Sequence, residues 1–298
     1  MIIKLNELVE LAKKRPKRKI AIAAADDYEV LEAIRNAVKE GLVEPVLIGH
    51  KPKITTIAEE LDFDMNTCEI IHVPDSVQAA MEATRLVREG YADVLMKGLV
   101  STQYLLRAVL DKENGLRSGE LLSHVAFFES PYYHKLLGLT DAAMNVSPTF
   151  EDKVALINNA VDAFHRLGTE IPKVAVIGSV ETINPKMEAT MHAATLSMMN
   201  KRNQIRGCTV DGPLALDNAV SKKSAELKHI ESDVAGDVDL IVAPEINGAN
   251  FLYKALNFIG GATAAAVIMG ARVPIVLTSR ADSERSKFLS IALAAAMD

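Results

Sequence analysis

The sequence has no tryptophan, two cysteines and six tyrosines in 298 residues, and each scarcity excludes a class of function. Cys68 and Cys208 lie too far apart to suggest a disulfide framework or a zinc cluster. So few aromatic residues offer no platform for stacking bases, and the net charge of -6 disfavours a phosphate backbone as partner. We therefore expect neither a nucleic-acid partner nor a bound metal.

Long apolar runs are also missing from the chain. The longest, around AAAVIMGA, is shorter than the roughly 20 residues that a membrane helix requires, and no signal-peptide pattern opens the sequence. The basic run from Lys13 to Lys19 lies between a helical pattern and a buried strand, so we interpret it as a solvated link. These features predict a soluble, cytoplasmic protein without a membrane partner.

Several catalytic signatures are absent. The chain contains no G-x-x-x-x-G-K-[ST], G-x-G-x-x-G, G-x-S-x-G or H-E-x-x-H, which disfavours P-loop enzymes, standard dinucleotide binders, serine hydrolases and zincins. Its seven histidines are scattered without metal-ligand spacing, and His124 lies within an apolar strand run that favours a core position.

Short β-branched runs alternate with helical patterns through most of the chain, which is typical of parallel sheets with crossover helices. Two strand-like runs after Leu121 are separated only by Ser-Pro-Tyr-Tyr, which favours an antiparallel or domain-crossing connection. We predict two doubly wound α/β domains with a cleft between them, where ligands bind in such folds. The first comprises residues 1–135 and 279–298, and the second comprises residues 136–278.

Polar side chains follow the predicted strands, where sheets of this class place their sites. Lys97 closes one strand, and Ser101 or Thr102 begins the next helix, which suits an anion or a simple helix cap. Asp141 and Asn145 follow another strand and either bind a ligand or hold the turn before Pro148.

Two further clusters lie nearer the end of the sequence. Asn250 and Lys254 belong to the helical pattern after the strand that ends at Pro244. The strand from Pro274 to Thr278 leads to Ser279 and Arg280, and we expect Asp282 in the first turn of the following helix. A guanidinium beside a hydroxyl at a strand end is suited to recognition of phosphate or of a developing oxyanion.

At these residues the sequence resembles the phosphate acetyl/butyryl-transferase family, and most of all its butyryl-transferring members. The similar segments are MKGLVST, LRSGELLSHVAFFE, LTDAAMN, APEINGANFLYK and MGARVPIVLTSRADS. The resemblance implies an isocitrate/isopropylmalate-dehydrogenase-like arrangement and a homo-oligomer of at least two chains. It also implies reversible conversion of a short acyl-CoA and phosphate into acyl phosphate and CoA, with no cofactor beyond these substrates.

The resemblance assigns the family's Ser-Arg pair to Ser279 and Arg280. We expect Arg280 and Lys97, with Thr102 or Ser123, to hold phosphate, and Ser279 or Asn250 to bind the thioester oxygen. Acetyl-transferring members carry an acid seven residues after the serine, where this chain has Ser286. Asp282 is therefore our first candidate for moving the thiol proton and Glu284 the second, and the transfer is uphill by about 6 kcal/mol between unperturbed groups.

Other functions remain compatible with the sequence. A phosphate acetyltransferase differs only in the size of its acyl pocket. A metal- and NAD-dependent decarboxylating dehydrogenase shares the arrangement but requires a carboxylate cluster, which we do not find. A silent CoA-binding protein would bind CoA without turnover, and phosphate-independent release of thiol would indicate a thioesterase.

Overall fold

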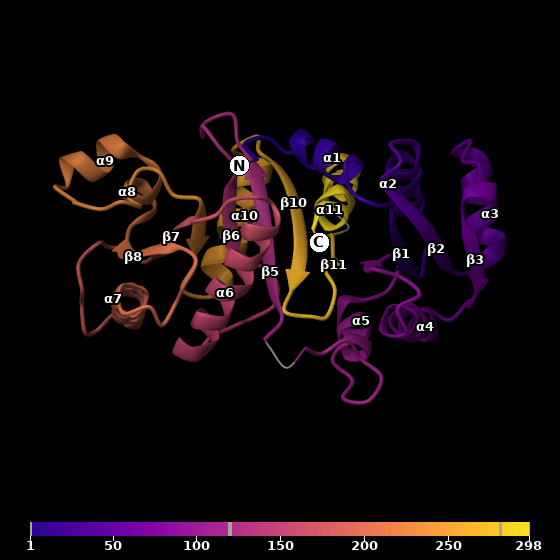
Figure 1. The fold of residues 1–298 in the computed structure, drawn as a ribbon, viewed down its shortest axis with the longest axis horizontal. Helices are drawn as coiled ribbons and strands as arrows, with labels where there is room; N and C mark the ends of the chain where they lie inside the picture. The colour runs from indigo at the N-terminus through magenta and orange to yellow at the C-terminus, as the bar shows by residue number, and fades with distance from the viewer. Residues whose placement is uncertain (1, 119–120, 280–281, 298) are drawn as a thin grey trace. The chain divides into compact units, whose positions relative to one another are not determined.

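The computed structural model describes residues 2–118, 121–279 and 282–297 (Figure 1). The chain divides into two compact units, of which unit 1 comprises residues 1–5 and 121–264, and unit 2 comprises residues 6–120 and 265–298. In the structure the units change after residues 120 and 264. The domain boundaries expected from the sequence were after residues 135 and 278.

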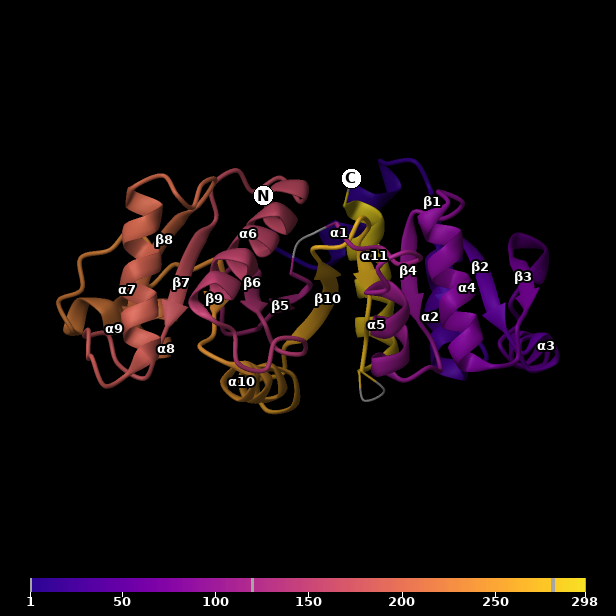
Figure 2. The same ribbon diagram turned by 90° about the horizontal axis from the view of Figure 1, so that it is seen from below.

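Unit 2 contains a sheet in the order β3-β2-β1-β4-β11-β10. Strands β3, β2, β1, β4 and β11 run parallel, and β10 is antiparallel to β11. Helices α1, α2 and α11 cover one face of this sheet, and α4 and α5 cover the other (Figures 1 and 2). The elements are α1 (Asn6–Lys13), β1 (Arg18–Ala23), α2 (Tyr28–Lys39), β2 (Val43–Gly49), α3 (Lys51–Glu60), the 3-10 turn η1 (Met65–Thr67), β3 (Glu69–His72), α4 (Ser76–Arg88), β4 (Val94–Lys97), α5 (Thr102–Val109), β10 (Thr263–Met269), β11 (Ile275–Val276) and α11 (Glu284–Ala296).

Local sequence explains where the helices of unit 2 begin. Asp27 caps α2, since its side chain accepts a hydrogen bond from the backbone of Val30. Helix α11 differs from α2 in having no polar stripe, because every residue from Ser286 to Ala296 is buried. A helix that is buried on every side belongs inside a protein, and α11 packs between α1 and α2.

Unit 1 contains a sheet in the order β5-β6-β9-β7-β8. Strand β5 is antiparallel to β6, with Phe127 opposite Gly138, while β6, β9, β7 and β8 run parallel. The elements are β5 (Ser123–Glu129), β6 (Leu137–Thr140), α6 (Phe150–Arg166), β7 (Lys173–Ile177), α7 (Glu188–Lys201), β8 (Thr209–Leu214), α8 (Leu216–Val220), α9 (Lys222–Leu227), β9 (Leu240–Val242) and α10 (Ile246–Phe258). The predicted α/β class and the antiparallel connection after Leu121 are both confirmed.

Across the described ranges, no helix combines the length and the apolar character needed to cross a membrane.

Candidate active site

In unit 2, strands β4 and β11 end side by side, because Val276 pairs with Met96 in a parallel register. The next residue of β4 is Lys97, whose Nζ donates to the carbonyl oxygens of Gly98 and Val100 at 3.2 and 3.3 Å. Gly98 must be glycine, since a Cβ there would lie 2.2 Å from the carbonyl oxygen of Ala24 at the end of β1. This close packing fixes the loop that leads from Lys97 to α5.

The loop ends at Ser101, which caps α5. Its Oγ accepts a hydrogen bond from the Tyr104 amide at 3.4 Å, and Thr102 is the first helical residue. The predicted start of a helix at these residues is confirmed. The positive end of the α5 dipole and two hydroxyl groups therefore lie at the strand ends, where they suit an oxyanion.

Ser279 and Asp282 form a closed turn after β11. The Ser279 amide donates to Asp282 Oδ2 at 2.7 Å, and the Asp282 amide donates to the Ser279 carbonyl oxygen at 3.2 Å. The sequence placed Asp282 in the first turn of the helix, which is wrong: Ser283 is the N-cap, and α11 begins at Glu284. The Ser283 Oγ accepts from the Ser286 amide at 3.1 Å, so Asp282 lies outside the helix.

Arg280, the other half of the predicted Ser-Arg pair, lies outside the described residues.

In unit 1, Asp141 follows β6 and is 3% exposed. Its Oδ1 accepts hydrogen bonds from the amides of Ala143 and Met144, both at 2.9 Å. Its Oδ2 accepts from the His124 amide at 3.1 Å and from Asn145 Nδ2 at 2.6 Å. Four donors thus surround this carboxylate, which holds the turn after β6 against the start of β5.

Three neighbours of Asp141 bind the same short segment, residues 121–124. Asn145 Nδ2 donates to the Leu122 carbonyl at 2.9 Å, and Thr140 Oγ1 donates to the His124 carbonyl at 2.9 Å. Asn159, on α6, donates to the Leu121 carbonyl at 2.7 Å and to Ser123 Oγ at 2.9 Å. Because Ser123 Oγ accepts from Asn159, its own hydrogen is directed elsewhere.

The two remaining predicted residues lie on α10. Asn250 Nδ2 donates to the Ala142 carbonyl at 3.0 Å, which ties α10 to the turn that Asp141 also holds. Lys254, one helical turn later, is exposed. The structure therefore gathers Ser123, Asp141, Asn145 and Asn250 at one edge of the unit 1 sheet, with Lys254 further out.

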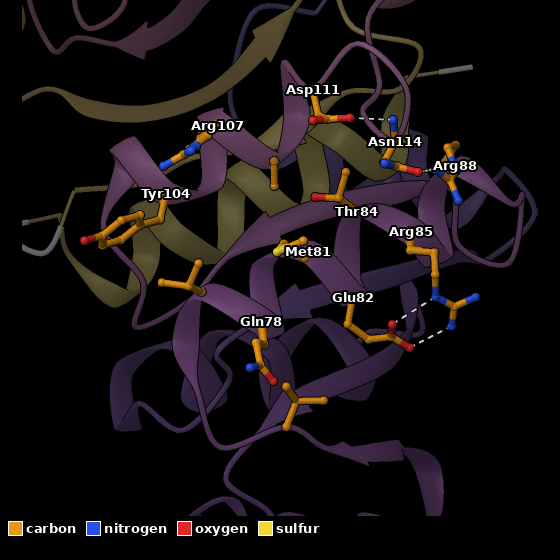
Figure 3. A pocket seen from close by; sticks show the side chains of 13 residues that line it. Gln78, Met81, Glu82, Thr84, Arg85, Arg88, Tyr104, Arg107, Asp111 and Asn114 are labelled. Atoms are coloured by element: carbon orange, nitrogen blue, oxygen red, sulfur yellow. Dashed lines mark hydrogen bonds and ion pairs between the residues drawn. The ribbon is translucent and has the colours of Figure 1, made fainter.

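A cavity of about 710 Å³, not expected from the sequence, opens between α4 and α5 in unit 2 (Figure 3). Met81 and Tyr104 supply apolar and aromatic surface, and three arginines line the same space: Arg85, Arg88 and Arg107. The cavity begins one helical turn from the Ser101 cap, because Tyr104 belongs to its wall.

The three arginines differ in their partners. Arg85 bonds Glu82 at 2.7 Å and also Glu89, and Arg88 donates to Asn114 at 2.6 Å. Within the part of the chain that the structure describes, the Arg107 side chain makes no hydrogen bond or ion pair (Figure 3). Its guanidinium is available to an anion.

Within residues 2–118, 121–279 and 282–297, no three His, Cys, Asp or Glu side chains lie together in an arrangement that could hold a metal ion.

Comparison with known proteins places these features in a family. A family model described as phosphate acetyl/butaryl transferase matches residues 4–81 and 74–295. The phosphate butyryltransferase of Clostridium acetobutylicum is 46% identical over 295 residues, covering 99% of this chain and 98% of that protein. The phosphate acetyltransferase of Thermotoga maritima is 47% identical over 291 residues, covering 98% of each.

A solved structure agrees with these relatives. The crystal structure of a branched-chain phosphotransacylase from Enterococcus faecalis V583 superposes with a TM-score of 0.82 at 34% identity, covering 93% of this chain and 97% of that one. Family match, relatives and fold coincide over nearly the whole chain. The chain therefore belongs to the phosphate acetyl/butyryl-transferase family.

Proposed function

We propose that this protein transfers a short acyl group, such as butyryl, between CoA and inorganic phosphate, giving acyl phosphate and free CoA in a reversible reaction. The observation that supports the proposal is the parallel register of β4 and β11, since β4 leads to Lys97 and the α5 N-terminus, and β11 leads to the hydrogen-bonded Ser279 and Asp282. Such a site suits an oxyanion, and the reaction needs no nucleophile from the enzyme. Phosphate is already a nucleophile, so orientation and charge stabilisation suffice.

In this mechanism a phosphate oxygen attacks the thioester carbonyl, and the tetrahedral intermediate collapses with CoA thiolate as leaving group. Lys97, Ser101 and Thr102 hold phosphate, together with Arg280, and Ser279 donates to the carbonyl oxygen as charge develops there. Ser123, Asn250 and Lys254 of unit 1 remain proposed substrate contacts. Asp141 and Asn145 act through the segment that they hold.

Asp282 remains our proposed proton carrier for the thiol. Its Oδ2 already accepts the Ser279 amide, so the carboxylate links the proton step to the position of Ser279. Asp282→Asn should lower kcat and change the pH-rate profile. An unchanged profile and kcat would remove Asp282 from proton transfer.

The cavity between α4 and α5 suits the nucleotide end of CoA. The adenine of CoA requires apolar and aromatic surface, which Met81 and Tyr104 provide. The phosphates of the same nucleotide require cations, which Arg107 provides. The cavity adjoins the Ser101 cap, so a CoA bound there extends toward the strand ends. This cavity supports CoA as a substrate.

Acyl chain length separates two candidates. Relatives that transfer butyryl and acetyl groups are 46% and 47% identical to this chain, so a phosphate acetyltransferase is the second candidate. Release of free thiol from acetyl-, butyryl- and isobutyryl-CoA should depend on phosphate and be fastest for butyryl-CoA. Thiol release without phosphate would indicate a thioesterase, and CoA binding without release would indicate a silent binder.

A substitution tests the site itself. Arg280→Ala should lower kcat/KM for phosphate and for acyl-CoA, because the guanidinium serves the attacking phosphate. Retention of wild-type values for both substrates would show that the Ser-Arg assignment is wrong.

We also propose that the protein is a homo-oligomer in the cytoplasm, where acyl-CoA and phosphate are available. Helix α10 supports self-association, since Phe251 and Phe258 are 69% and 67% exposed and Ile259 beyond it is 88% exposed. Sedimentation of the wild type and of Phe251→Ser with Phe258→Ser should show a smaller assembly for the double variant. An equal mass for both would exclude this face.

A further inference from the structure

Lys287, on the helix that follows the Ser279 turn, is a buried cation in an unfavourable place. It is the fourth residue of α11 and only 3% exposed. Near a helix N-terminus the backbone dipole repels a positive charge, and burial removes hydration as well. A lysine at this position does not stabilise the helix. We therefore look to the contacts of the Lys287 side chain for its role.

The Lys287 ammonium makes two short contacts. Its Nζ donates to the Asp282 carbonyl oxygen at 2.6 Å and pairs with Glu29 Oε2, on α2, at 2.6 Å. The Glu29 side chain is 57% exposed, so this carboxylate balances the buried Lys287 charge from the solvent side and does not touch the Ser279–Asp282 contacts. The contact with Asp282 is therefore the more informative one.

Asp282 passes this restraint on to Ser279. Lys287 fixes the carbonyl of Asp282, the Asp282 carboxylate accepts the Ser279 amide, and the Asp282 amide returns a bond to the Ser279 carbonyl. Three described residues thus form one chain of hydrogen bonds that starts inside α11 and ends at the predicted catalytic serine.

We propose that Lys287 is a positioning residue for acyl transfer, which orders the Ser279–Asp282 turn through the Asp282 carbonyl. The proposal rests on the proposed function, because Ser279 is assigned to the reacting groups there. The Lys287 charge also adds to the positive end of α11 behind this turn, which favours an anion in front of it.

The test compares Lys287→Met, Lys287→Arg and Glu29→Gln. Loss of the ammonium in Lys287→Met should lower kcat/KM for phosphate at least tenfold, while KM for acyl-CoA stays within about twofold of wild type. Lys287→Arg keeps a donor and a charge and should recover most of the loss. Glu29→Gln removes the ion pair but keeps the carbonyl contact, so it should lower stability and leave kcat/KM for phosphate as in the wild type.

Amide hydrogen exchange gives a readout that does not depend on turnover. Peptides containing Ser279 and Asp282 should exchange faster in Lys287→Met than in wild type or Glu29→Gln. If Lys287→Met does not fold, Lys287→Gln, which retains a shorter donor, should show the same faster exchange.

Equal kinetic losses in Lys287→Met and Glu29→Gln, or unchanged exchange in a folded Lys287 variant, would overturn the proposal. Absence of phosphate-dependent thiol release in the wild type would instead refute the proposed function, and the exchange comparison would still decide whether Lys287 orders the turn.

Discussion

The side-chain amide of Asn159 donates to Ser123 Oγ at 2.9 Å, and both side chains are buried. The same amide donates to the Leu121 carbonyl, so one residue of α6 holds the beginning of β5 at two points. The contact joins positions 36 residues apart. It occupies one lone pair of Ser123 Oγ and leaves the other lone pair for a further donor.

Asn159→Leu should destabilise the protein by about 2–3 kcal/mol, because it leaves a buried carbonyl and a buried hydroxyl without their donor. Ser123→Ala removes the hydroxyl but keeps the bond to Leu121, so its cost should be about 1 kcal/mol. Urea unfolding of both variants measures the difference. A larger loss for Ser123→Ala would contradict the role given to Asn159.

Asp141→Asn distinguishes the two sequence interpretations of that residue, ligand binding and turn stabilisation. Asparagine has one acceptor oxygen, so at least two of the four donors around Asp141 lose a partner. We expect a loss of roughly 3 kcal/mol in unfolding free energy. A variant with wild-type stability but no activity would instead support direct contact with substrate.

Arg107→Met should raise KM for acyl-CoA by about tenfold or more and leave kcat nearly unchanged, as expected for a lost charge-assisted hydrogen bond. Acyl-pantetheine is a substrate analogue that lacks the nucleotide of CoA, so the kcat/KM for this analogue should be the same in Arg107→Met and in the wild type. Arg166→Met, on α6 in unit 1, is the control variant. It should leave kcat/KM unchanged for acyl-CoA and for the acyl-pantetheine analogue. Equal effects on both substrates would place the nucleotide outside this cavity.

Stability should fall as the pH drops below about 6.5, through a contact in unit 1. Lys153 Nζ lies 3.0 Å from His192 Nδ1. Burial, together with the Lys153 charge, lowers the pKa of His192, so the folded state binds its proton more weakly than the unfolded chain. His192 thus costs nothing above its ordinary pKa near 6.5, and stability declines as pH falls below it.

His192→Gln keeps an acceptor for Lys153 but does not titrate. Thermal unfolding should therefore show a shallower decline between pH 7.5 and 5.5 for this variant than for the wild type. Parallel curves would mean that other histidines account for the pH dependence.

Residues at strand ends were predictable from sequence, because a strand pattern followed by a hydroxyl or a lysine has a direct meaning in a parallel sheet. Lys97, Ser101 and Ser279 were identified in this way. The position of Asp282 relative to the helix was predicted wrongly. Aspartate and serine are both good helix N-caps, so the sequence alone does not show that Ser283 caps α11 and that Asp282 precedes it.

Residues that act from a neighbouring element left no such signal. Asn159 lies in the middle of an ordinary amphipathic helix, and nothing local relates it to Ser123. Lys287 resembles any surface lysine until α11 is seen to be buried all round. Arg107 becomes notable only when α4 packs beside α5 and leaves a cavity between them, which is a property of the packing.

The chain order of unit 2 has a consequence for synthesis. Strand β11 lies between β4 and β10 in the sheet of unit 2, and α11 packs between α1 and α2, yet both elements follow residues 121–264 in the chain. During translation the sheet of unit 1 is complete while the first strands of unit 2 still expose the surfaces that β11 and α11 later cover. Ribosome-bound chains stopped after residue 264 should therefore recruit chaperones through the N-terminal half, and release them once α11 has emerged.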